Sequence, residues 1–468
     1  MYNANALPPD LLDELRALLG DRLSTGLAVR EHHGRDESSH PAALPDAVVW
    51  PETTEEVSTI ARLCHAFRVP MIPFGVGSSL EGHVIPLHGG VSSDLSHMNR
   101  ILALHVEDLD ATVQAGVTRK QLNAWLHDSG LFFPIDPGAD ATLGGMTATR
   151  ASGTNAVRYG SMREAVLALT VVLADGRVIH TGTRARKSAA GYDLTRLFVG
   201  SEGTLGIVTE ITVRLHPHLE AISAAVCGFP DVASAARTVI QTIQTGVPVA
   251  RAELLDALSM RAINAHSKTN WPEVPTLFFE FHGTEAGVAE QAETVQALAH
   301  EHGGTDFRWA TRQEERTQLW AARHDAYFAC LQLRPGSRSL TTDVCVPISR
   351  LAECIEATAA DVAGMPMPVP LLGHVGDGNF HLLVLTDPDS AAEREAAHAL
   401  SHRLVLRALA MGGTCTGEHG VGFGKMGYLA EEHGEALDVM RAIKHALDPY
   451  GLMNPGKIVE TEPQDARR

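Results

Sequence analysis

Toward the end of the chain, three histidines and one carboxylate occur in glycine-rich surroundings. His374 and His381 flank a Gly-Asp-Gly-Asn turn, and Glu418 and His419 lie between two glycines. A continuous strand would direct the first two histidines to opposite faces, but a turn between them reverses the chain, so their imidazoles can converge. Two imidazoles and one carboxylate form a ligand set for a divalent metal with an open position for substrate. For any one of the 24 histidines, an ordinary core or surface role is the alternative.

Other reactive side chains have less informative surroundings. Arg323 lies beside apolar residues on a predicted helix. Its guanidinium is a salt-bridge partner, a snorkelling group or a fork that binds a substrate carboxylate. Cys415 lacks a local base or a helix N-terminus, so we expect a small buried thiol rather than a nucleophile. Arg186 and Lys187 lie in a polar loop and are expected to be solvated.

Segments rich in glycine and other small residues occur around residues 75–79, 136–155 and 200–207. Glycines let backbone N–H groups approach phosphate oxygens and form an anion-binding concavity. The spacing of the first segment fits neither the Rossmann nor the P-loop fingerprint, and one such segment alone is equally a structural turn. Three of them in the first half of the chain indicate an extended ligand that the backbone approaches closely, such as a dinucleotide.

Helices and strands alternate in the part of the chain that must position these segments. We expect one short amphipathic helix in the first 45 residues, and then a surface lead-in over residues 31–39. A strand follows at 47–51, and a capping box of Thr53 and Glu56 starts a helix over 57–64. The strand at 70–74 runs directly into the first glycine turn. A second capping box, Thr118 with Gln121, opens a helix that Gly130 closes.

From about residue 220 the pattern predicts strands at 222–229, 247–254, 276–282 and 307–309, with helices at 231–245 and 286–300. This βαββαβ order is typical of a ferredoxin-like unit. A helix over 315–333 and a strand over 342–346 are expected next. A hairpin that holds His374 and His381 follows, and the last 60 residues alternate helices and glycine-rich loops.

Composition restricts the class of protein. The 468 residues carry a formal net charge of −18 and are 44% hydrophobic, which indicates a globular chain of several domains. An acidic chain without basic runs lacks the positive field that nucleic acid requires. We expect no transmembrane segment and, because the start lacks signal-peptide features, a cytoplasmic enzyme. The six scattered cysteines predict neither a disulfide framework nor an iron–sulfur or zinc-ribbon site.

Several motifs carry a family resemblance. Residues 73–82 resemble the diphosphate loop of the vanillyl-alcohol-oxidase type of FAD-binding domain. Residues 151–160 and 186–194 resemble the branch of D-lactate and D-2-hydroxyacid dehydrogenase flavoproteins. Residues 200–207, 374–381, 417–422 and 454–457 also match, in the family's order, so the resemblance covers roughly residues 40–460.

The resemblance implies an α+β fold. It comprises an FAD-binding domain of the VAO/PCMH type with two α+β subdomains, a ferredoxin-like substrate (cap) domain and a helical C-terminal segment. The corresponding ranges are a lead-in at 1–41, the FAD-binding domain at 42–218, the substrate domain at 219–400, and at 401–468 a segment that returns to the FAD domain.

The resemblance also implies a noncovalent FAD. Relatives with covalent flavin carry a histidine where this chain has Ser78, and His83 lies several residues beyond that position. The implied FAD contacts are Phe74, Gly75, Val76, Gly77, Ser78, Ser79, Asp136, Pro137, Gly138, Thr142, Gly144, Gly145, Ser152, Gly153, Tyr159, Glu202, Gly206, Ile207 and Asn454.

By the same carry-over, His374, His381 and Glu418 match the family's ligands for one divalent metal, which is zinc, manganese or iron. His419 matches the catalytic base and Arg323 the arginine that binds the substrate carboxylate. The implied reaction removes the hydroxyl proton of a D-2-hydroxy acid and transfers the Cα hydrogen as hydride to flavin N5. A 2-oxo acid results.

The substrate side chain is predicted from positions at which this chain differs from related proteins. Relatives that act on D-2-hydroxyglutarate carry a threonine, a lysine and an asparagine where this chain has Tyr327, Thr341 and Leu383. Fewer polar groups favour a monocarboxylate such as D-lactate, with D-2-hydroxyglutarate and glycolate as alternatives. The electrons are expected to pass to a separate acceptor, either a cytochrome, a quinone or an electron-transfer flavoprotein. A homodimer and peripheral attachment to an inner membrane stay open.

Two other classes of function compete with this reading. A metallohydrolase would use the His/His/Glu set to activate water and would be colourless. A non-catalytic FAD-binding subunit of a glycolate-oxidising complex would not need the metal set or the Glu418-His419 pair.

Overall fold

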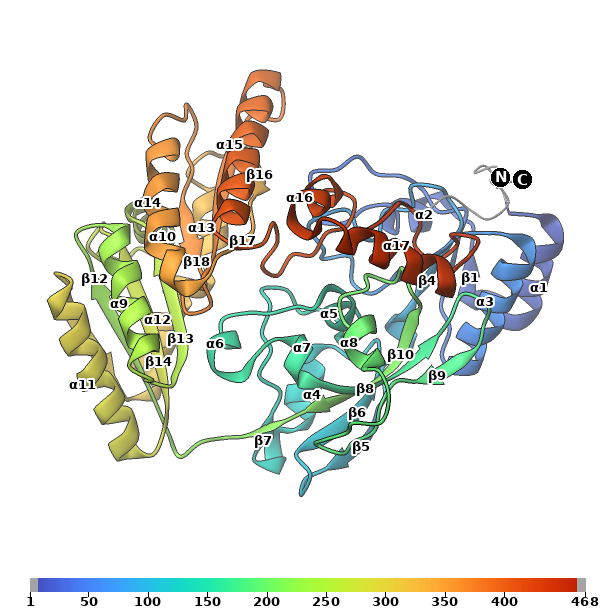
Figure 1. The fold of residues 1–468 in the computed structure, drawn as a ribbon, viewed down its shortest axis with the longest axis horizontal. Coiled ribbons are helices and arrows are strands. Elements are labelled where there is room, and N and C mark those ends of the chain that lie inside the picture. Colours follow the sequence, from blue (N-terminus) through green and yellow to red (C-terminus); the bar gives the residue numbers. More distant parts are fainter. Residues whose placement is uncertain (1–6, 461–468) are drawn as a thin grey trace. The chain divides into compact units, whose positions relative to one another are not determined.

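The computed structural model describes residues 7–460, which form two compact units (Figure 1). Unit 1 contains the described residues up to Ser152, then Gly160–His218, and those from Glu418 onward. Unit 2 contains Gly153–Tyr159 and Leu219–Gly417. Both units combine helices with sheets. Within residues 7–460, no helix is both long and apolar enough to cross a membrane.

Unit 1 contains two main sheets. The first has the order β1-β2-β4-β3, in which β2, β4 and β3 are parallel and β1 is antiparallel to β2. Its strands are β1 (Leu23–Ser24), β2 (Ala47–Val49), β3 (Met71–Phe74) and β4 (Val91–Asp94). The second sheet is antiparallel with the order β5-β6-β10-β8-β9. Its strands are β5 (Ile101–His105), β6 (Asp110–Gln114), β8 (Val166–Val172), β9 (Val178–His180) and β10 (Ile207–Arg214), and β7 (Leu131–Phe132) pairs with β11 (His216–Pro217) separately.

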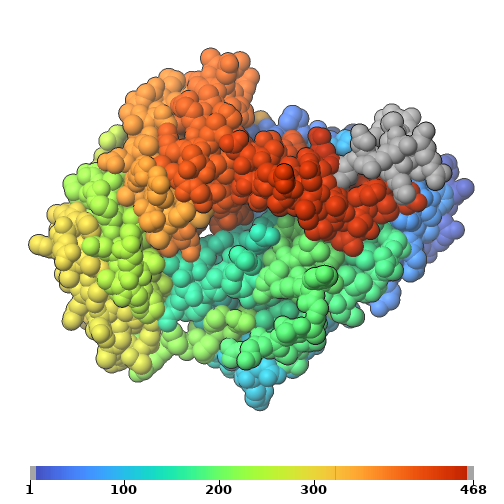
Figure 2. Space-filling model, viewed as in Figure 1, coloured from blue at the N-terminus to red at the C-terminus, as the bar shows by residue number. Residues whose placement is uncertain are grey.

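Unit 1 contains several α-helices, and most of them contribute side chains to one core. They are α1 (Pro9–Leu19), α2 (Leu27–His32), α3 (Thr54–Phe67), α4 (Arg119–Trp125), α5 (Leu143–Thr149), α7 (Met162–Ala165), α8 (Leu194–Phe198), α16 (Leu429–His433) and α17 (Ala436–Leu447). The core joins distant segments, because Leu11 of α1, Met71 of β3, Ile211 of β10 and Met453 belong to the same buried cluster. Helix α17 lies on the surface of this unit, in red in Figure 2.

Two expectations for the start of the chain are wrong in detail. Residues 31–39 are not only a surface lead-in, since His33 is buried and its Nε2 donates to Asp94 at 2.9 Å. Thr53 caps α3 by accepting from the N–H of Glu56, but the Glu56 carboxylate accepts from the N–H of Glu52 and pairs with Arg22. The Thr118–Gln121 capping box is confirmed, and Gly130 follows in the left-handed conformation.

Unit 2 is built on one antiparallel sheet with the order β15-β12-β14-β13-β18-β19-β16, with β17 also paired to β19. The strands are β12 (Ala221–Gly228), β13 (Val249–Leu255), β14 (Thr276–Gly283), β15 (Thr305–Ala310), β16 (Arg338–Thr341), β17 (Val344–Cys345), β18 (Leu371–Gly373) and β19 (Asn379–Thr386). Within the sheet, the first four strands of the chain lie side by side in the order 4-1-3-2, which is the ferredoxin-like order that the sequence predicted. The predicted βαββαβ pattern lacks one helix, α10, which lies between the second and third of these strands.

Helices cover both faces of this sheet (Figure 1). They are α6 (Ala156–Tyr159), α9 (Val232–Gln244), α10 (Ala257–Ser267), α11 (Glu285–Glu301), α12 (Gln313–His324), α13 (Ala326–Leu331), α14 (Leu351–Val362) and α15 (Ala391–Ala410). Helix α11, yellow in Figure 2, forms part of the surface of the unit. The other face carries a core that includes Leu255, Met260, Phe278 and Trp320.

Two elements of unit 2 differ from expectation. The helix expected over 315–333 is two helices, α12 and α13, interrupted at Asp325. The interruption lets Ala326, Ala329 and Cys330 of α13 pack into the core beside α10. Of the strand expected over 342–346, only β17 forms, and a separate strand, β16, precedes the expected range; the two pair with different stretches of β19.

Candidate active site

The two histidines of the metal motif lie on one hairpin of unit 2. His374 directly follows β18, and His381 lies within β19. The turn between them depends on Gly378, whose φ is +81° and whose added Cβ would meet the carbonyl oxygen of Val346 at 2.2 Å. The hairpin brings the imidazole rings together with centroids 5.5 Å apart and an interplanar angle of 79°. The turn therefore produces the convergence that makes a shared ligand chemically reasonable.

Each of these rings has its Nδ1 atom held by an acceptor. His374 Nδ1 lies 2.8 Å from Oε1 of Glu253, and His381 Nδ1 lies 3.0 Å from the carbonyl oxygen of Thr342. Carboxylate and carbonyl oxygens only accept, so the protons are on Nδ1 and the lone pairs on Nε2. Histidines that bind metals typically donate their other ring N–H in this way. The donor chemistry of the hairpin therefore fits a divalent cation.

Glu253 was not identified from the sequence. It lies in β13 with 1% of its side chain exposed, and its Oε2 accepts from Nε and Nη2 of Arg323 at 2.9 and 2.6 Å. Burial acts to raise the pKa of Glu253, but its electrostatic interactions and hydrogen bonds with His374 and Arg323 outweigh burial and hold the pKa below its ordinary value. The available signal was a carboxylate inside a mainly apolar strand, whose other charged residue is Arg251. Arg323, on α12, is thus an ion-pair partner through its Nε and Nη2 groups.

Glu418 and His419 follow directly after the last residue of unit 2, Gly417. A Cβ on Gly417 would meet Nδ2 of Asn379 at 2.2 Å and Oδ1 of Asp343 at 3.0 Å, so this glycine lies against the start of β19. The hydroxyl of Thr416 donates to Oδ2 of Asp343 at 2.8 Å. The chain segment that precedes the Glu-His pair is therefore held in place by contacts within unit 2.

On the far side of that pair, the chain is fixed within unit 1 by Glu202. The N–H groups of Val421 and Gly422 donate to the two Glu202 oxygens at 2.7 and 2.8 Å. Glu202 also pairs with His83 at 3.2 Å, and both side chains are almost fully buried. Burial acts to lower the pKa of His83, but the negative charge of Glu202 outweighs it and the pKa is raised. Sequence analysis missed this pair, although Glu202 lies in the 200–207 motif and His83 directly follows the 73–82 motif.

Three of the segments assigned to FAD meet in unit 1. The turn after β3 approaches the N-terminus of α5, since a Cβ on Gly75 would meet Oγ1 of Thr142 at 2.5 Å. A Cβ on Gly203 would meet Cγ of Pro73 at 2.8 Å, which brings in the 200–207 segment. Asn454 joins them by donating to the carbonyl groups of His83 and Glu202 at 2.9 and 2.8 Å. These close backbone approaches, which exclude side chains, fit the cradle of an extended dinucleotide.

The remaining assigned residues are divided between the units. Ser152 belongs to unit 1, whereas Gly153 and Tyr159 belong to unit 2. The Tyr159 hydroxyl lies 2.7 Å from Nδ1 of His282, whose Nε2 lies 2.8 Å from Glu280. Residues 136–138 lie in the loop before α5 in unit 1, and Gly206 and Ile207 lie at the start of β10. The individual cofactor, metal and catalytic assignments stay predictions.

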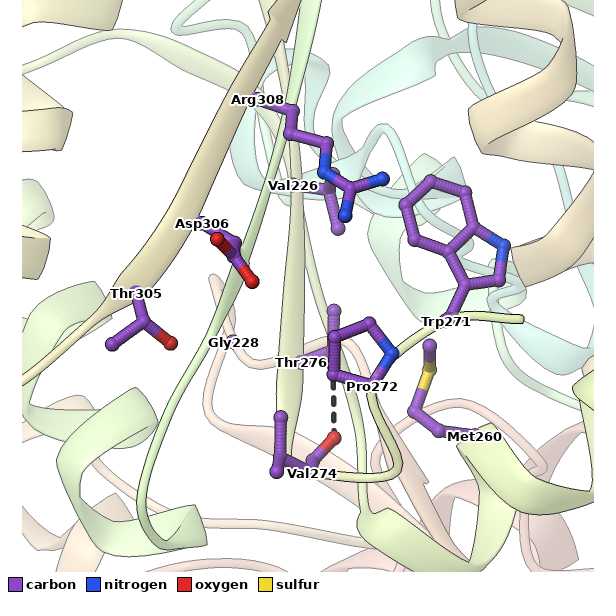
Figure 3. A pocket seen from close by; sticks show the side chains of 10 residues that line it. All are labelled: Val226, Gly228, Met260, Trp271, Pro272, Val274, Thr276, Thr305, Asp306 and Arg308. Carbon is purple, nitrogen blue, oxygen red and sulfur yellow. Dashed lines mark hydrogen bonds between the residues drawn. The ribbon is translucent and has the colours of Figure 1, made fainter.

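A small cavity in unit 2 is lined by side chains outside the motifs (Figure 3). Its volume is about 20 Å³, with the Arg308 guanidinium 4.9 Å from the centroid of the Trp271 ring. A space of this size holds about one water molecule. It is too small for a 2-hydroxy acid and is not the candidate site.

Comparison with known families agrees with the motifs. Residues 45–182 match the FAD binding domain family, and residues 218–458 match the family described as FAD linked oxidases, C-terminal domain. The chain is 53% identical over 455 residues to probable D-lactate dehydrogenase, mitochondrial, of Danio rerio, with 96% of this chain and 92% of that protein covered. It is 49% identical to D-lactate dehydrogenase (cytochrome), mitochondrial, of Arabidopsis thaliana, with 97% of this chain and 80% of that protein covered.

Solved structures show the same fold. The 4-ethylphenol oxidase of Gulosibacter chungangensis superposes with a TM-score of 0.80 at 19% identity, with 100% of both chains covered. The predicted α+β fold of the VAO/PCMH type and the predicted family are therefore confirmed. The chain is an oxidoreductase that belongs to the FAD-linked oxidase family of flavoproteins, the family that includes the D-lactate dehydrogenases.

Proposed function

We propose that this flavoprotein uses FAD and one divalent metal to oxidise a D-2-hydroxy acid, foremost D-lactate, to the 2-oxo acid, and passes the electrons to a separate acceptor. The observation that carries the proposal is the His374–His381 pair, whose rings lie together and whose Nδ1 atoms both donate to acceptors, so that each Nε2 can act as a metal ligand. The relatives named D-lactate dehydrogenase support the substrate. The name of the plant relative supports a cytochrome as one acceptor, with a quinone and an electron-transfer flavoprotein as alternatives.

FAD would be held by the turn after β3, the N-terminus of α5 and the 200–207 segment, and the metal by His374, His381 and Glu418. Among these residues, Glu418 directly follows Gly417, which lies against β19 within unit 2. The Cα atoms of two consecutive residues are about 3.8 Å apart. When bound, the flavin supplies the acceptor for a hydride and the metal supplies positive charge beside the substrate hydroxyl.

The chain's own side chains would bind the substrate and move its proton. Glu253 takes the Nε and Nη2 groups of Arg323, so the Nη1/Nη2 end of the guanidinium remains to hold the substrate carboxylate through two N–H groups. His419 accepts the hydroxyl proton, a role worth typically about 10²–10⁴-fold in rate. The carboxylate is thereby fixed while the hydroxyl loses its proton.

The substrate's far end would meet few charges. Thr341 and Leu383 are cross-strand partners in β16 and β19, and Tyr327 lies on α13. None of these three side chains carries a positive charge that would bind a second carboxylate. The arrangement favours a monocarboxylate over D-2-hydroxyglutarate.

Anaerobic flavin absorbance tests this function. D-lactate is expected to bleach the flavin and L-lactate to leave it oxidised, and a chelator should abolish the bleaching until metal is restored. Glycolate and D-2-hydroxyglutarate serve as alternative substrates in parallel samples. A protein that takes up FAD but is bleached equally by D-lactate after complete metal removal contradicts the metal role, and bleaching by D-2-hydroxyglutarate alone contradicts the proposed substrate. A protein that takes up no FAD, with metal-dependent hydrolysis instead, would favour the metallohydrolase.

A further inference from the structure

One carboxylate in unit 2 contacts two of the residues proposed for the reaction. Glu253 Oε1 and Oε2 lie 2.8 and 2.9 Å from Nδ1 of His374, and Oε2 also accepts from Nε and Nη2 of Arg323. His374 follows β18, which is next to β13 in the sheet, whereas Arg323 projects from α12. The two partners are 121 and 70 residues away in sequence.

The fold itself does not call for a charge at this position. The cross-strand partner of Glu253 is Phe278, and Leu255, two residues on and thus on the same face, belongs to an apolar core. A buried ion carries an effective penalty of several kcal/mol, and an apolar side chain of similar volume is often equally stable there. The presence of a carboxylate is therefore best explained by what it does to its two partners.

We infer that Glu253 is a positioning residue that orients a metal ligand and the substrate-binding arginine together. By accepting from His374 it fixes the tautomer that presents Nε2, and by accepting from the Nε/Nη2 edge of Arg323 it leaves the other end of the guanidinium for a carboxylate. The inference rests on the proposed function. It adds that metal affinity and substrate affinity depend on the same carboxylate.

Unit 2 offers a matched control in the neighbouring strand. Glu280 of β14 is also a buried carboxylate, 2.8 Å from Nε2 of His282 and 3.6 Å from Nε of Arg251. It makes the same type of carboxylate–histidine–arginine cluster without touching His374 or Arg323. Glu280→Gln therefore removes a buried, histidine-paired carboxylate of the same sheet and leaves the contacts of Glu253 intact. Because its partner His282 contacts Tyr159, the variants are compared at matched FAD content.

The test titrates zinc or manganese, by calorimetry, into FAD-loaded protein from which metal has been removed. Glu253→Gln retains one carbonyl acceptor but presents an amide NH₂ to the second donor, and we expect its metal affinity to fall about 10–100-fold. At saturating metal, its KM for D-lactate should rise more than its kcat falls. Glu280→Gln should keep the wild-type metal affinity and KM.

Glu253→Asp is the second variant, for use if Glu253→Gln does not fold. It retains the charge but withdraws the carboxylate by one methylene, so it should fold and still lose metal affinity, with a smaller rise in KM. A folded Glu253→Gln or Glu253→Asp protein whose metal affinity and KM both stay within twofold of wild type overturns the inference while the proposed function stands. Wild-type protein that binds neither metal overturns the metal part of the proposed function and this inference with it.

Discussion

Individual ion pairs in unit 1 connect its first segments. Arg22, just before β1, donates through Nη1 and Nη2 to the carboxylate of Glu56 at 2.7 and 2.5 Å, and Glu56 also accepts from the N–H of Glu52. The side chains of Arg22 and Glu56 are only 24% and 19% exposed. The hydrogen bonds from Arg22 are the main reason that the pKa of Glu56 is lowered.

Glu56→Gln should therefore destabilise the protein in a pH-dependent way. A carboxyl with a lowered pKa in the folded state contributes stability that is fully present above its unfolded pKa of about 4.3 and is lost as the pH falls through the folded value. We expect the variant to be less stable by about 1–2 kcal/mol at pH 7. The difference should shrink below about pH 4.5.

Urea denaturation followed by circular dichroism at pH 7, 5 and 4 measures this difference. Glu55→Gln is the control, because Glu55 is exposed in the same first turn of α3 and feels the same helix dipole. A stability loss for Glu56→Gln that is unchanged at pH 4 would contradict the ion pair as its source.

At the scale of elements, the Glu202 side chain anchors the loop after the Glu418-His419 pair. Glu202 accepts from the N–H groups of Val421 and Gly422 with separate oxygens. Its own φ is +52°, in the left-handed region that residues other than glycine rarely adopt. Glu202 keeps this unfavourable backbone conformation at the position where its carboxylate holds the loop. We therefore expect the loop to become more mobile when the carboxylate is changed.

Hydrogen–deuterium exchange of peptides that cover residues 418–424 measures that loosening. In Glu202→Gln the single carbonyl oxygen can serve one N–H group, so the amides of Val421 and Gly422 should exchange about tenfold faster or more. Glu81→Gln is the control, because Glu81 pairs with Lys425 at 3.2 Å through its side chain. The loop N–H groups of Phe423 and Gly424 donate to the Glu81 backbone carbonyl, which that substitution retains. Unchanged exchange in Glu202→Gln would refute the anchoring role.

Elements were predictable where one face of a helix or strand is apolar. The ferredoxin-like strands and helices of unit 2 could be predicted from the local pattern of apolar residues, because these elements bury their apolar side chains. The break at Asp325 was not predictable, because α12 and α13 each continue a helical pattern and only the packing of α13 against α10 separates them. Tertiary packing thus overrides a pattern that is locally consistent.

The candidate site was predictable where the motif and the turn are local. The Gly-Asp-Gly-Asn turn predicts that His374 and His381 converge, and their rings do lie together. Glu253 and His83 were missed because their partners are distant in sequence, and no spacing rule reports such a pair. The sequence signal for Glu253 was its place, together with Arg251, as a charged residue in the mainly apolar strand β13.

For the whole molecule, the path of the chain makes each unit discontinuous. It passes between the units after Ser152, Tyr159, His218 and Gly417. The short excursion at 153–159 is held in unit 2, where Arg158 donates to the carbonyl of Pro248 at 2.5 Å and Arg251 donates to Asn155 at 2.9 Å. Neither unit is therefore a contiguous stretch of sequence.

Unit 1 in particular is completed by its last segment. The N–H of Asn454 donates to the carbonyl of Met71, at the edge of the parallel sheet, at 2.8 Å. Lys444, with 4% of its side chain exposed, donates to the carbonyl of Thr204 at 2.7 Å and pairs with Asp448. Leu452 and Met453 belong to the core of the unit. A fragment that ends at residue 218 would lose all of these contacts.

We therefore expect residues 1–218 alone to show no cooperative unfolding transition and to retain no FAD. The same fragment joined through a flexible Gly/Ser linker to residues 418–468 should recover both, because the linker restores the missing edge contact and core residues. Asp448→Ala in the joined protein provides the control: it leaves the buried Lys444 ammonium without its anion and should cost about 3–5 kcal/mol. Thermal unfolding and flavin absorbance measure the two properties. A cooperative, flavin-binding 1–218 fragment would show instead that the carboxyl-terminal segment is an accessory to unit 1 rather than part of its core.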